Sequence, residues 1–246
     1  MINKKTDKRS FSIKQQNGNV LFLILIAVAL FAALSYAVTQ STRGGGNADD
    51  ETALLNSTTV TQFGGTIASA IQRMMLFNGV DETELCFYTG NNHTDYNHAG
   101  CADNMNNIFH PDGGGVGYQA PPGDANDGTD WEFSSRPQIF GQGKTTPVGG
   151  PYNDNVDLIL VLRGMNQSIC EKINEEIGVS GIPIDSGELD VDRFDGDYVM
   201  GDNVDGCNPN CTTLSGSPFV QVASHIGCFE EANGGDYVYF HTLLAR

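Results

Sequence analysis

The chain has 246 residues, of which 13 are basic and 30 acidic, and its formal net charge is −17. Beyond position 43, seven basic residues stand against 29 acidic ones, which leaves this part with a formal charge of −22. So large a surplus of carboxylates repels phosphate backbones and excludes nucleic-acid binding as a function. Cations and basic partners remain compatible with it, and solubility alone is the simpler explanation of the charge.

An unbroken apolar run occupies residues 20–38, VLFLILIAVALFAALSYAV, without charge, Pro or Gly. As a helix, these nineteen residues rise about 28 Å, close to the roughly 30 Å hydrocarbon core of a bilayer. The run predicts a transmembrane helix at 19–43. An alternative is a cleaved secretory signal peptide, with Ser35-Tyr36-Ala37 as its small-x-small cleavage site.

A short basic segment at 1–18 precedes the run and contains Lys4, Lys5, Lys8, Arg9 and Lys14. The first basic residue on the other side is Arg43. The positive-inside bias therefore predicts a single-pass membrane protein with a cytoplasmic N-terminus. Its C-terminal domain is expected in the periplasm or on the cell surface.

The sequence QQNG at 15–18, followed at once by the apolar helix, resembles a type IV prepilin-like N-terminus. In that family a prepilin peptidase cuts after the Gly that ends a basic leader. The resemblance implies a cut between Gly18 and Asn19, and assembly with other pilin-like subunits or with secretion machinery. This chain has Asn19 where the family usually has Phe or Met, and Leu23 where it usually has Glu. Family members without that Glu are mostly minor subunits thought to sit at a filament tip.

All six cysteines follow the apolar run, and none lies in the basic leader. An even count on the oxidising side of a membrane is typical of disulfides, and six cysteines allow 15 pairings. Our preferred pairing is Cys86–Cys101, Cys207–Cys211 and Cys170–Cys228. The alternative for Cys207 and Cys211 is half of a zinc site, although the chain has no second pair at matching spacing.

The exported part, 49–246, begins after a predicted Gly-rich joint at 44–48, which a typical pilin helix lacks. Asp49 and Asp50 supply capping chemistry for a second helix. Its apolar residues follow steps of 3, 4, 4 and 3, and the pattern runs on through Leu76. The interruption by Gly64-Gly65 costs about 1 kcal/mol per Gly relative to Ala. We expect the stripe to pack on a sheet; it consists of Val60, Phe63, Ile67, Ile71 and Met74.

A polar excursion at 89–150 is rich in Gly, Asn, Asp and Pro, so we expect sparse regular structure there. The residues expected to anchor it to the body are Trp131, Phe133, Ile139 and Phe140.

Clearer patterns follow the excursion. Residues 156–162 predict a buried strand, and Asn166 can cap a helix that runs to Glu176 and stops at Gly178. Strands are expected at 219–223 and 237–244. A helix followed by a strand-rich region predicts an α+β fold, the order seen in pilin-like domains.

An Asp-rich loop at 185–206 suits Ca²⁺, which takes six to eight oxygen ligands from a bendable loop. The candidate ligands are Asp190, Asp192, Asp195, Asp197, Asp202 and Asp205. The alternative is a solvated acidic loop, since the spacing does not fit an EF-hand. A weaker Ca²⁺ candidate surrounds Gly128 and comprises Asp124, Asn126, Asp127 and Asp130.

Catalytic patterns are missing from the sequence, which has no Gly-x-Ser-x-Gly elbow and no convincing nucleophile–base pair. We therefore expect a non-enzymatic, pilin-like subunit of a surface filament or secretion apparatus, either a minor pilin or a pseudopilin. The alternative is a membrane-tethered extracytoplasmic binding protein whose acidic domain is stabilised by calcium. A secreted hydrolase fits least well.

If the Asp-rich loop binds Ca²⁺, calcium should raise the thermal unfolding temperature of the exported domain, because a ligand that binds only the folded state stabilises it. Differential scanning calorimetry in Ca²⁺ and in chelator measures the effect. Equal unfolding temperatures would contradict the calcium site.

Overall fold

A computed structural model describes residues 19–42, 45–90, 94–137, 139, 156–185, 193–198, 224–231 and 235–246. The chain forms two compact units, Met1–Asp49 and Asp50–Arg246. The predicted leader at 1–18, Gly18 included, lies outside the described residues.

Helix α1 spans Asn19–Thr42 and begins at the residue that the prepilin-like motif predicts as the first mature position. The sequence from Val20 to Leu34 contains only apolar residues, so the helix has no polar face over this length. Its described side chains, at 20–36, are all exposed, and Phe31 keeps 73% of its surface accessible. Among the residues that the structure describes, no helix combines the length and hydropathy of a membrane span.

Helix α2 spans Gly45–Arg73 and ends in a π-helical turn, η1, at Met74–Asn78. Residues 45–48 of the predicted Gly-rich joint belong to this helix, whereas residue 44 lies outside the described residues. Extending an existing helix backward requires no new nucleation, which limits the penalty to about 1 kcal/mol per Gly.

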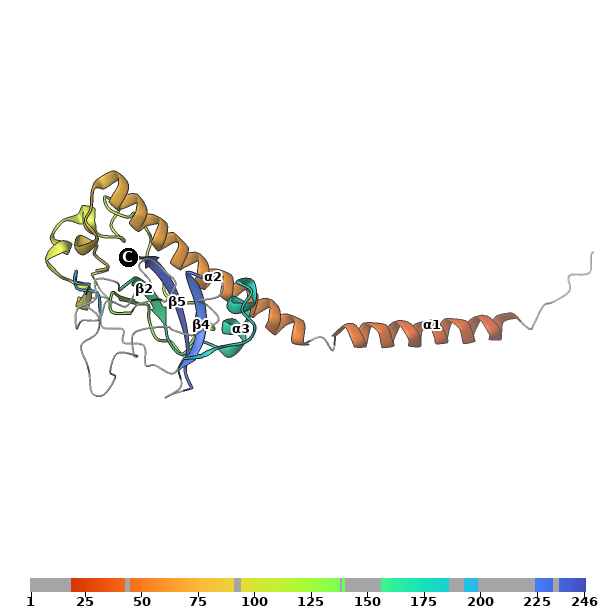
Figure 1. The fold of residues 1–246 in the computed structure, drawn as a ribbon. Coiled ribbons are helices and arrows are strands. Elements are labelled where there is room, and N and C mark those ends of the chain that lie inside the picture. Colours follow the sequence, from red (N-terminus) through yellow and green to blue (C-terminus); the bar gives the residue numbers. More distant parts are fainter. Residues whose placement is uncertain are drawn as a thin grey trace, which may run out of the picture. The chain divides into compact units, whose positions relative to one another are not determined.

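The predicted apolar stripe of α2 is buried from Val60 through Met74. It packs against one face of the sheet, in a core that also contains Phe133, Leu160 and Tyr239 (Figure 1).

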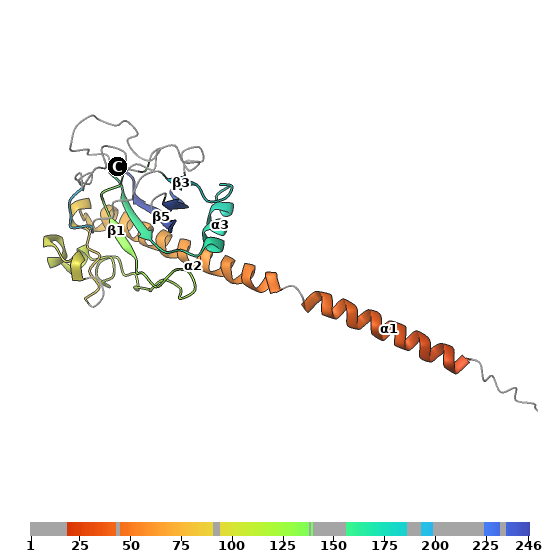
Figure 2. The ribbon, with the colours of Figure 1, turned by 90° about the horizontal axis from the view of Figure 1, so that it is seen from below.

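Five strands form the sheet, in the order β1-β2-β5-β4-β3. The first four are antiparallel to their neighbours, and the short β3 runs parallel to β4 (Figure 2). The α+β prediction is confirmed, with one long helix against a mainly antiparallel sheet. The strands are β1 Glu132–Ser134, β2 Leu158–Leu162, β3 Ile184–Asp185, β4 Ile226–Glu231 and β5 Tyr237–Leu244.

Strand β2 is buried at every position, which explains its continuous apolar sequence LILVL. Leu158, Leu160 and Leu162 belong to the core beneath α2. Ile159 and Val161 belong to a second apolar cluster on the opposite face of the sheet, together with Phe229 and Phe240 of the neighbouring strands. The sheet is therefore covered on both faces at its centre.

Three strands differ from the sequence-based expectation, and the short β3 is one of them. Strand β1 lies inside the excursion predicted to have little regular structure, and it pairs with β2 through the anchor residue Phe133. Strand β4 was not predicted, whereas the strand expected at 219–223 lies outside the described residues. The anchors Trp131 and Ile139 are buried as predicted, and Phe140 is not described.

Helix α3, Gln167–Glu176, begins after Asn166 as predicted, and Gly178 follows it with a φ of 80°. A disulfide joins Cys170 of α3 to Cys228 of β4, with the two Cα atoms 5.3 Å apart. One turn later the buried Asn174 side chain accepts a hydrogen bond from the Cys228 N–H and donates one to its carbonyl. The Asn174 amide thus pairs with both backbone groups of Cys228, as a neighbouring strand would. Strand β4 is therefore attached to α3 by the disulfide and by these two hydrogen bonds.

Gly64 permits a close approach between α2 and β5. A Cβ atom at this position would lie 2.3 Å from Nδ1 of His241, whereas a Cβ atom at Gly65 would meet nothing within 4 Å. The same Nδ1 lies 2.9 Å from the hydroxyl oxygen of Tyr239. Helix and sheet are therefore in contact through backbone at Gly64, which leaves no room for a side chain.

Asp157, at the start of β2, is a fully buried carboxylate. It accepts hydrogen bonds from the backbone N–H groups of Ile139 at 2.8 Å and Arg246 at 3.0 Å. Burial raises its pKa to about 6, because the two N–H donors only partly replace water around the charge. The bond to Arg246 also fixes the C-terminal residue against the sheet.

Replacing Gly64 by Ala should lower the free energy of unfolding by about 1–3 kcal/mol, because the new methyl group overpacks against the imidazole of His241. Gly65→Ala, one residue away in the same helix, is the matched control. It should raise the free energy of unfolding by about 1 kcal/mol through helix propensity. Urea unfolding of the purified chain, with its disulfides intact, measures both. Equal effects of the two substitutions would contradict the close approach.

The pH dependence of stability should reveal Asp157. Its pKa is raised in the folded state, so its stabilising contribution is complete below about pH 4 and is lost as the pH rises through 6. His241 acts in the opposite direction, because burial lowers its pKa to about 4 and stability falls as the pH drops from 6.5.

Comparing the wild type with Asp157→Asn isolates the carboxylate, since His241 is common to both. The stability of the wild type relative to the variant should fall by about 3 kcal/mol between pH 3.5 and pH 7, which corresponds to the raised pKa. Urea unfolding at the two pH values is the measurement. A difference that stays constant with pH would show that Asp157 does not titrate in this range.

Candidate functional site

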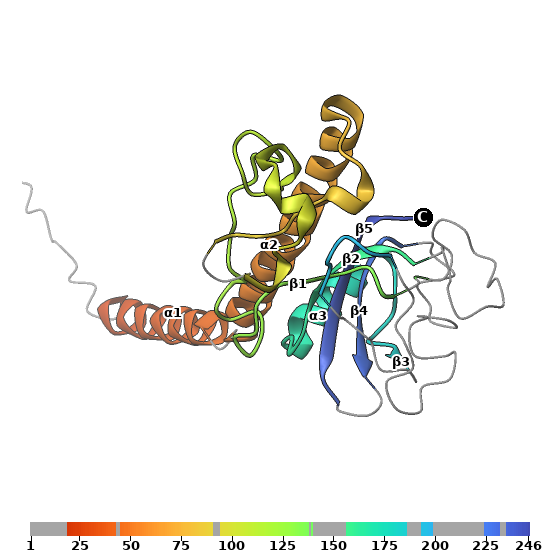
Figure 3. The same cartoon turned by 90° about the vertical axis from the view of Figure 1, so that its left-hand side faces the viewer.

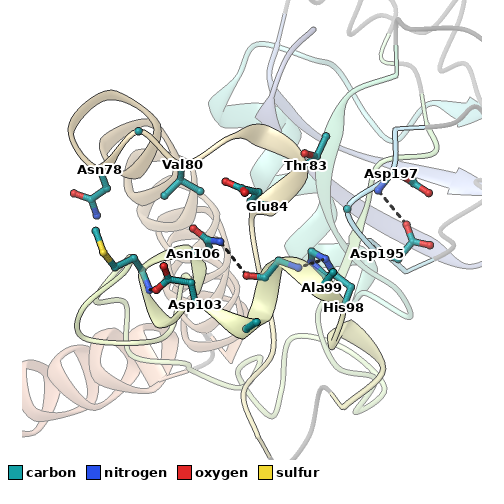
Figure 4. A pocket seen from close by; sticks show the side chains of 15 residues that line it. Asn78, Val80, Thr83, Glu84, His98, Ala99, Asp103, Asn106, Asp195 and Asp197 are labelled. Atoms are coloured by element: carbon teal, nitrogen blue, oxygen red, sulfur yellow. Dashed lines mark hydrogen bonds between the residues drawn. The ribbon is translucent and has the colours of Figure 1, made fainter.

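A shallow cleft of about 660 Å³ lies beyond the end of α2 in the larger unit (Figure 4). Three 3₁₀ turns and the segment 195–197 contribute its walls. The turns are η2 Glu82–Glu84, η4 Ala99–Ala102 and η5 Asn104–Asn106.

The predicted disulfide Cys86–Cys101 holds these turns together, with the two Cα atoms 5.2 Å apart. Cys86 is also paired with the segment after η5, since its N–H donates to Asn106 and its carbonyl accepts from Ile108. This loop-rich region therefore keeps a defined shape through one covalent bond, a local backbone ladder and buried apolar residues such as Leu85 and Ile108. Cys207 and Cys211, the third predicted pair, lie outside the described residues.

Four carboxylates line the cleft, from Glu84, Asp103, Asp195 and Asp197. Three of them accept backbone hydrogen bonds that fix the local turns. Glu84 accepts from the N–H of Asp81, Asp103 from that of Met105 and Asp195 from that of Asp197. Each carboxylate retains further acceptor capacity, because an ionised carboxylate has about four lone-pair sites. The cleft can therefore accept hydrogen bonds from a cation.

His98 is the one side chain able to carry a positive charge among the described residues that line the cleft. Its Nε2 lies 2.9 Å from the carbonyl oxygen of Leu85, and its Nδ1 accepts a hydrogen bond from Gly100 N–H. These two contacts assign a neutral imidazole with its proton on Nε2. The ring also packs edge-on against Phe194. Both ring nitrogens of His98 thus hydrogen-bond to the backbone, and the side chain holds the turn η4 in place.

Gly196 brings the Asp-rich segment against the turns that precede it. Its φ is +96°, and a Cβ atom would lie 2.7 Å from the carbonyl oxygen of Thr83. Glycine is required here on both counts. The contact places Asp195 and Asp197 at the cleft, although they lie about 100 residues from the turns in sequence.

Only part of the predicted calcium loop is described. Asp195 and Asp197 lie at the cleft, whereas Asp190, Asp192, Asp202 and Asp205 fall outside the described residues. Within the described part of the chain, no three His, Cys, Asp or Glu side chains are arranged to hold a metal ion.

The weaker calcium candidate forms a hydrogen-bonded turn instead. Asn126 accepts from Gly128 N–H, Asp127 accepts from Thr129 N–H, and Asp130 accepts from the hydroxyl of Tyr118. The side-chain oxygens of Asn126 and Asp127 accept backbone hydrogen bonds that stabilise the turn, and these bonds compete with metal ligation for the same oxygens.

An exposed apolar group borders the cleft and was missed from the sequence. It consists of Leu76, Phe77 and Met105, which we call the apolar tip; their exposed fractions are 78%, 81% and 43%. Met105 lines the cleft. Leu76 and Phe77 lie in η1, the helical turn that continues α2 (Figure 3). The apolar pattern predicts a helix that runs through Leu76, and the structure places this exposed residue in the π-helical turn η1. The exposure of Leu76 and Phe77 could not be predicted from the sequence, because the spacing of apolar residues does not reveal the π-helical turn.

No protein-family model, curated protein or solved structure matches the chain. The structure contains a long helix packed on a mainly antiparallel sheet, together with two disulfides. This arrangement is compatible with a pilin-like head without identifying one. The disulfides indicate an extracytoplasmic domain, because they persist in oxidising compartments.

Proposed function

We propose that the chain is a non-enzymatic, pilin-like subunit, a minor pilin or pseudopilin, of a surface filament or secretion apparatus. The observation that carries the proposal is α1, whose apolar side chains are exposed on every face and which begins directly after the leader-like sequence ending in Gly18. In this proposal the bilayer holds the subunit through α1 before assembly.

The cost of hydrating α1 supports this proposal. Fully burying a Val, Leu, Ile or Phe side chain is worth about 1.5–3 kcal/mol, so covering this helix is worth on the order of 20 kcal/mol. A helix that is apolar all round is buried in a membrane or among other helices. A pilin-like subunit meets both environments: lipid surrounds its helix before assembly, and neighbouring helices surround it in the assembled filament.

Leu23 supports a minor rather than a bulk subunit, by the resemblance described above. It occupies the position where most pilin-like chains carry Glu, and its side chain is 58% exposed on α1. An uncharged residue there can enter a bilayer or a helix bundle without desolvating a carboxylate.

A tethered binding protein is the second candidate, and the acidic cleft with its apolar tip favours it. In that case α1 stays in the membrane as an uncleaved anchor and the exported domain presents the cleft to a partner. The two candidates share topology and compartment, and they differ in whether the leader is removed.

Mass spectrometry of the mature N-terminus, on protein from its native host, separates the candidates. A terminus at Asn19, N-methylated as in pilin-like proteins, supports the filament subunit. An intact Met1 or Ile2 would favour the tethered binding protein, and a terminus at Val38 would mean a cleaved signal peptide and remove both. Gly18→Leu should block cleavage and accumulate the longer chain, whereas the neighbouring control Asn17→Ala should be processed normally.

A further inference from the structure

The apolar tip is exposed because the end of α2 is not α-helical. In an α-helix Phe77, three residues after Met74, would follow the buried stripe. The wider π turn of η1 displaces it, and Phe77 is 81% exposed, more than any other large apolar residue that the structure describes in the larger unit.

Hydrogen bonds fix this displacement. The N–H groups of Gly79 and Val80 both donate to the carbonyl oxygen of Met74, and Gly79 takes a φ of 68° that suits glycine. Beside the turn, the guanidinium of Arg73 donates to the carbonyl oxygen of Gly114. The exposure of the tip is therefore built into the backbone, and single π turns of this kind often occur at functional sites.

The acidic cleft begins directly after the tip in sequence, because Asn78, Gly79 and Val80, which follow Phe77, line it. Met105 borders two hollows, the cleft with Glu84, Asp103, Asp195 and Asp197, and a neighbouring one with Asp103 and Asp112. No Lys or Arg lines either hollow among the described residues. The surface thus combines a protruding apolar group with an adjacent acidic recess.

We propose that this surface docks a protein partner that inserts a Lys or Arg side chain into the cleft while covering Leu76 and Phe77 with an apolar patch. Charge complementarity selects this occupant. The carboxylates oppose an anionic lipid surface, and they oppose a second copy whose exported part carries a formal charge of −22. Apolar anchors beside a desolvated charge pair are the usual composition of a binding hot spot. The proposal does not depend on how the N-terminus is processed.

The test uses the full chain in nanodiscs of zwitterionic lipid. The probe is a fluorescein-labelled, otherwise Gly/Ser dodecapeptide that contains Lys-Phe-Lys, and fluorescence anisotropy measures its binding. Phe77→Ser and Glu84→Gln should each weaken binding at least fivefold. Glu84→Gln retains the oxygen that accepts from Asp81, and Phe77 is exposed, so both variants keep the fold.

Matched controls are Leu55→Ser, an exposed apolar residue elsewhere on α2, and Glu176→Gln, an exposed carboxylate on α3; both should stay within twofold of the wild type. A Glu-Phe-Glu peptide should not bind. Equal weakening by site and control variants would overturn the proposal, as would absence of binding by the Lys-Phe-Lys peptide. Self-association that Phe77→Ser abolishes, measured by analytical ultracentrifugation, would also overturn it in favour of a second copy.

Discussion

A helix without a polar face is the constraint on which this protein depends. From Val20 to Leu34 every residue of α1 is apolar, and the described side chains are all exposed. Leaving these side chains in water is costly, because the free energy of covering them exceeds the whole net stability of a typical domain. The function we propose places lipid or other helices around α1 and so provides that cover.

The larger unit has a hydrophobic core of its own. Its core lies between the buried stripe of α2 and the sheet, and it is closed by contacts that leave little room for change, such as Gly64 against His241. Two disulfides add covalent links to this packing. Cys86–Cys101 shapes the turns around the cleft, and Cys170–Cys228 fixes α3 to β4. An acidic, disulfide-linked domain of this kind suits an oxidising, extracytoplasmic environment.

The elements that the sequence predicted correctly are those with a local signal. The stripe of α2 follows the helical period, β2 is a continuous apolar run because both its faces are covered, and α3 ends near Gly178 with a positive φ. Strands β1 and β4 have no such signal. β1 has three residues, too few to show a period, and β4 depends on Cys170 and Asn174 of α3.

The candidate site was only partly predictable for the same reason. The Asp-rich pattern predicts Asp195 and Asp197 as calcium ligands, and this stays a prediction. Their position beside Glu84 and Asp103 in the cleft results from tertiary contacts at Gly196 and the Cys86–Cys101 disulfide. The apolar tip was not predicted: the stripe expected to be core ends at Met74, just before Leu76 and Phe77. Apolar identity indicates burial on average, and only the backbone of η1 shows that Phe77 faces outward.

The central claim is that α1 is covered by neighbouring helices in the assembled state. Site-specific photo-crosslinking in the native host tests it most directly, with a photoreactive residue placed in turn at each position from 20 to 36. The account predicts crosslinks to other protein chains that recur every three to four residues along α1. Crosslinks to lipid alone at every position would contradict assembly through this helix and leave α1 as a simple anchor.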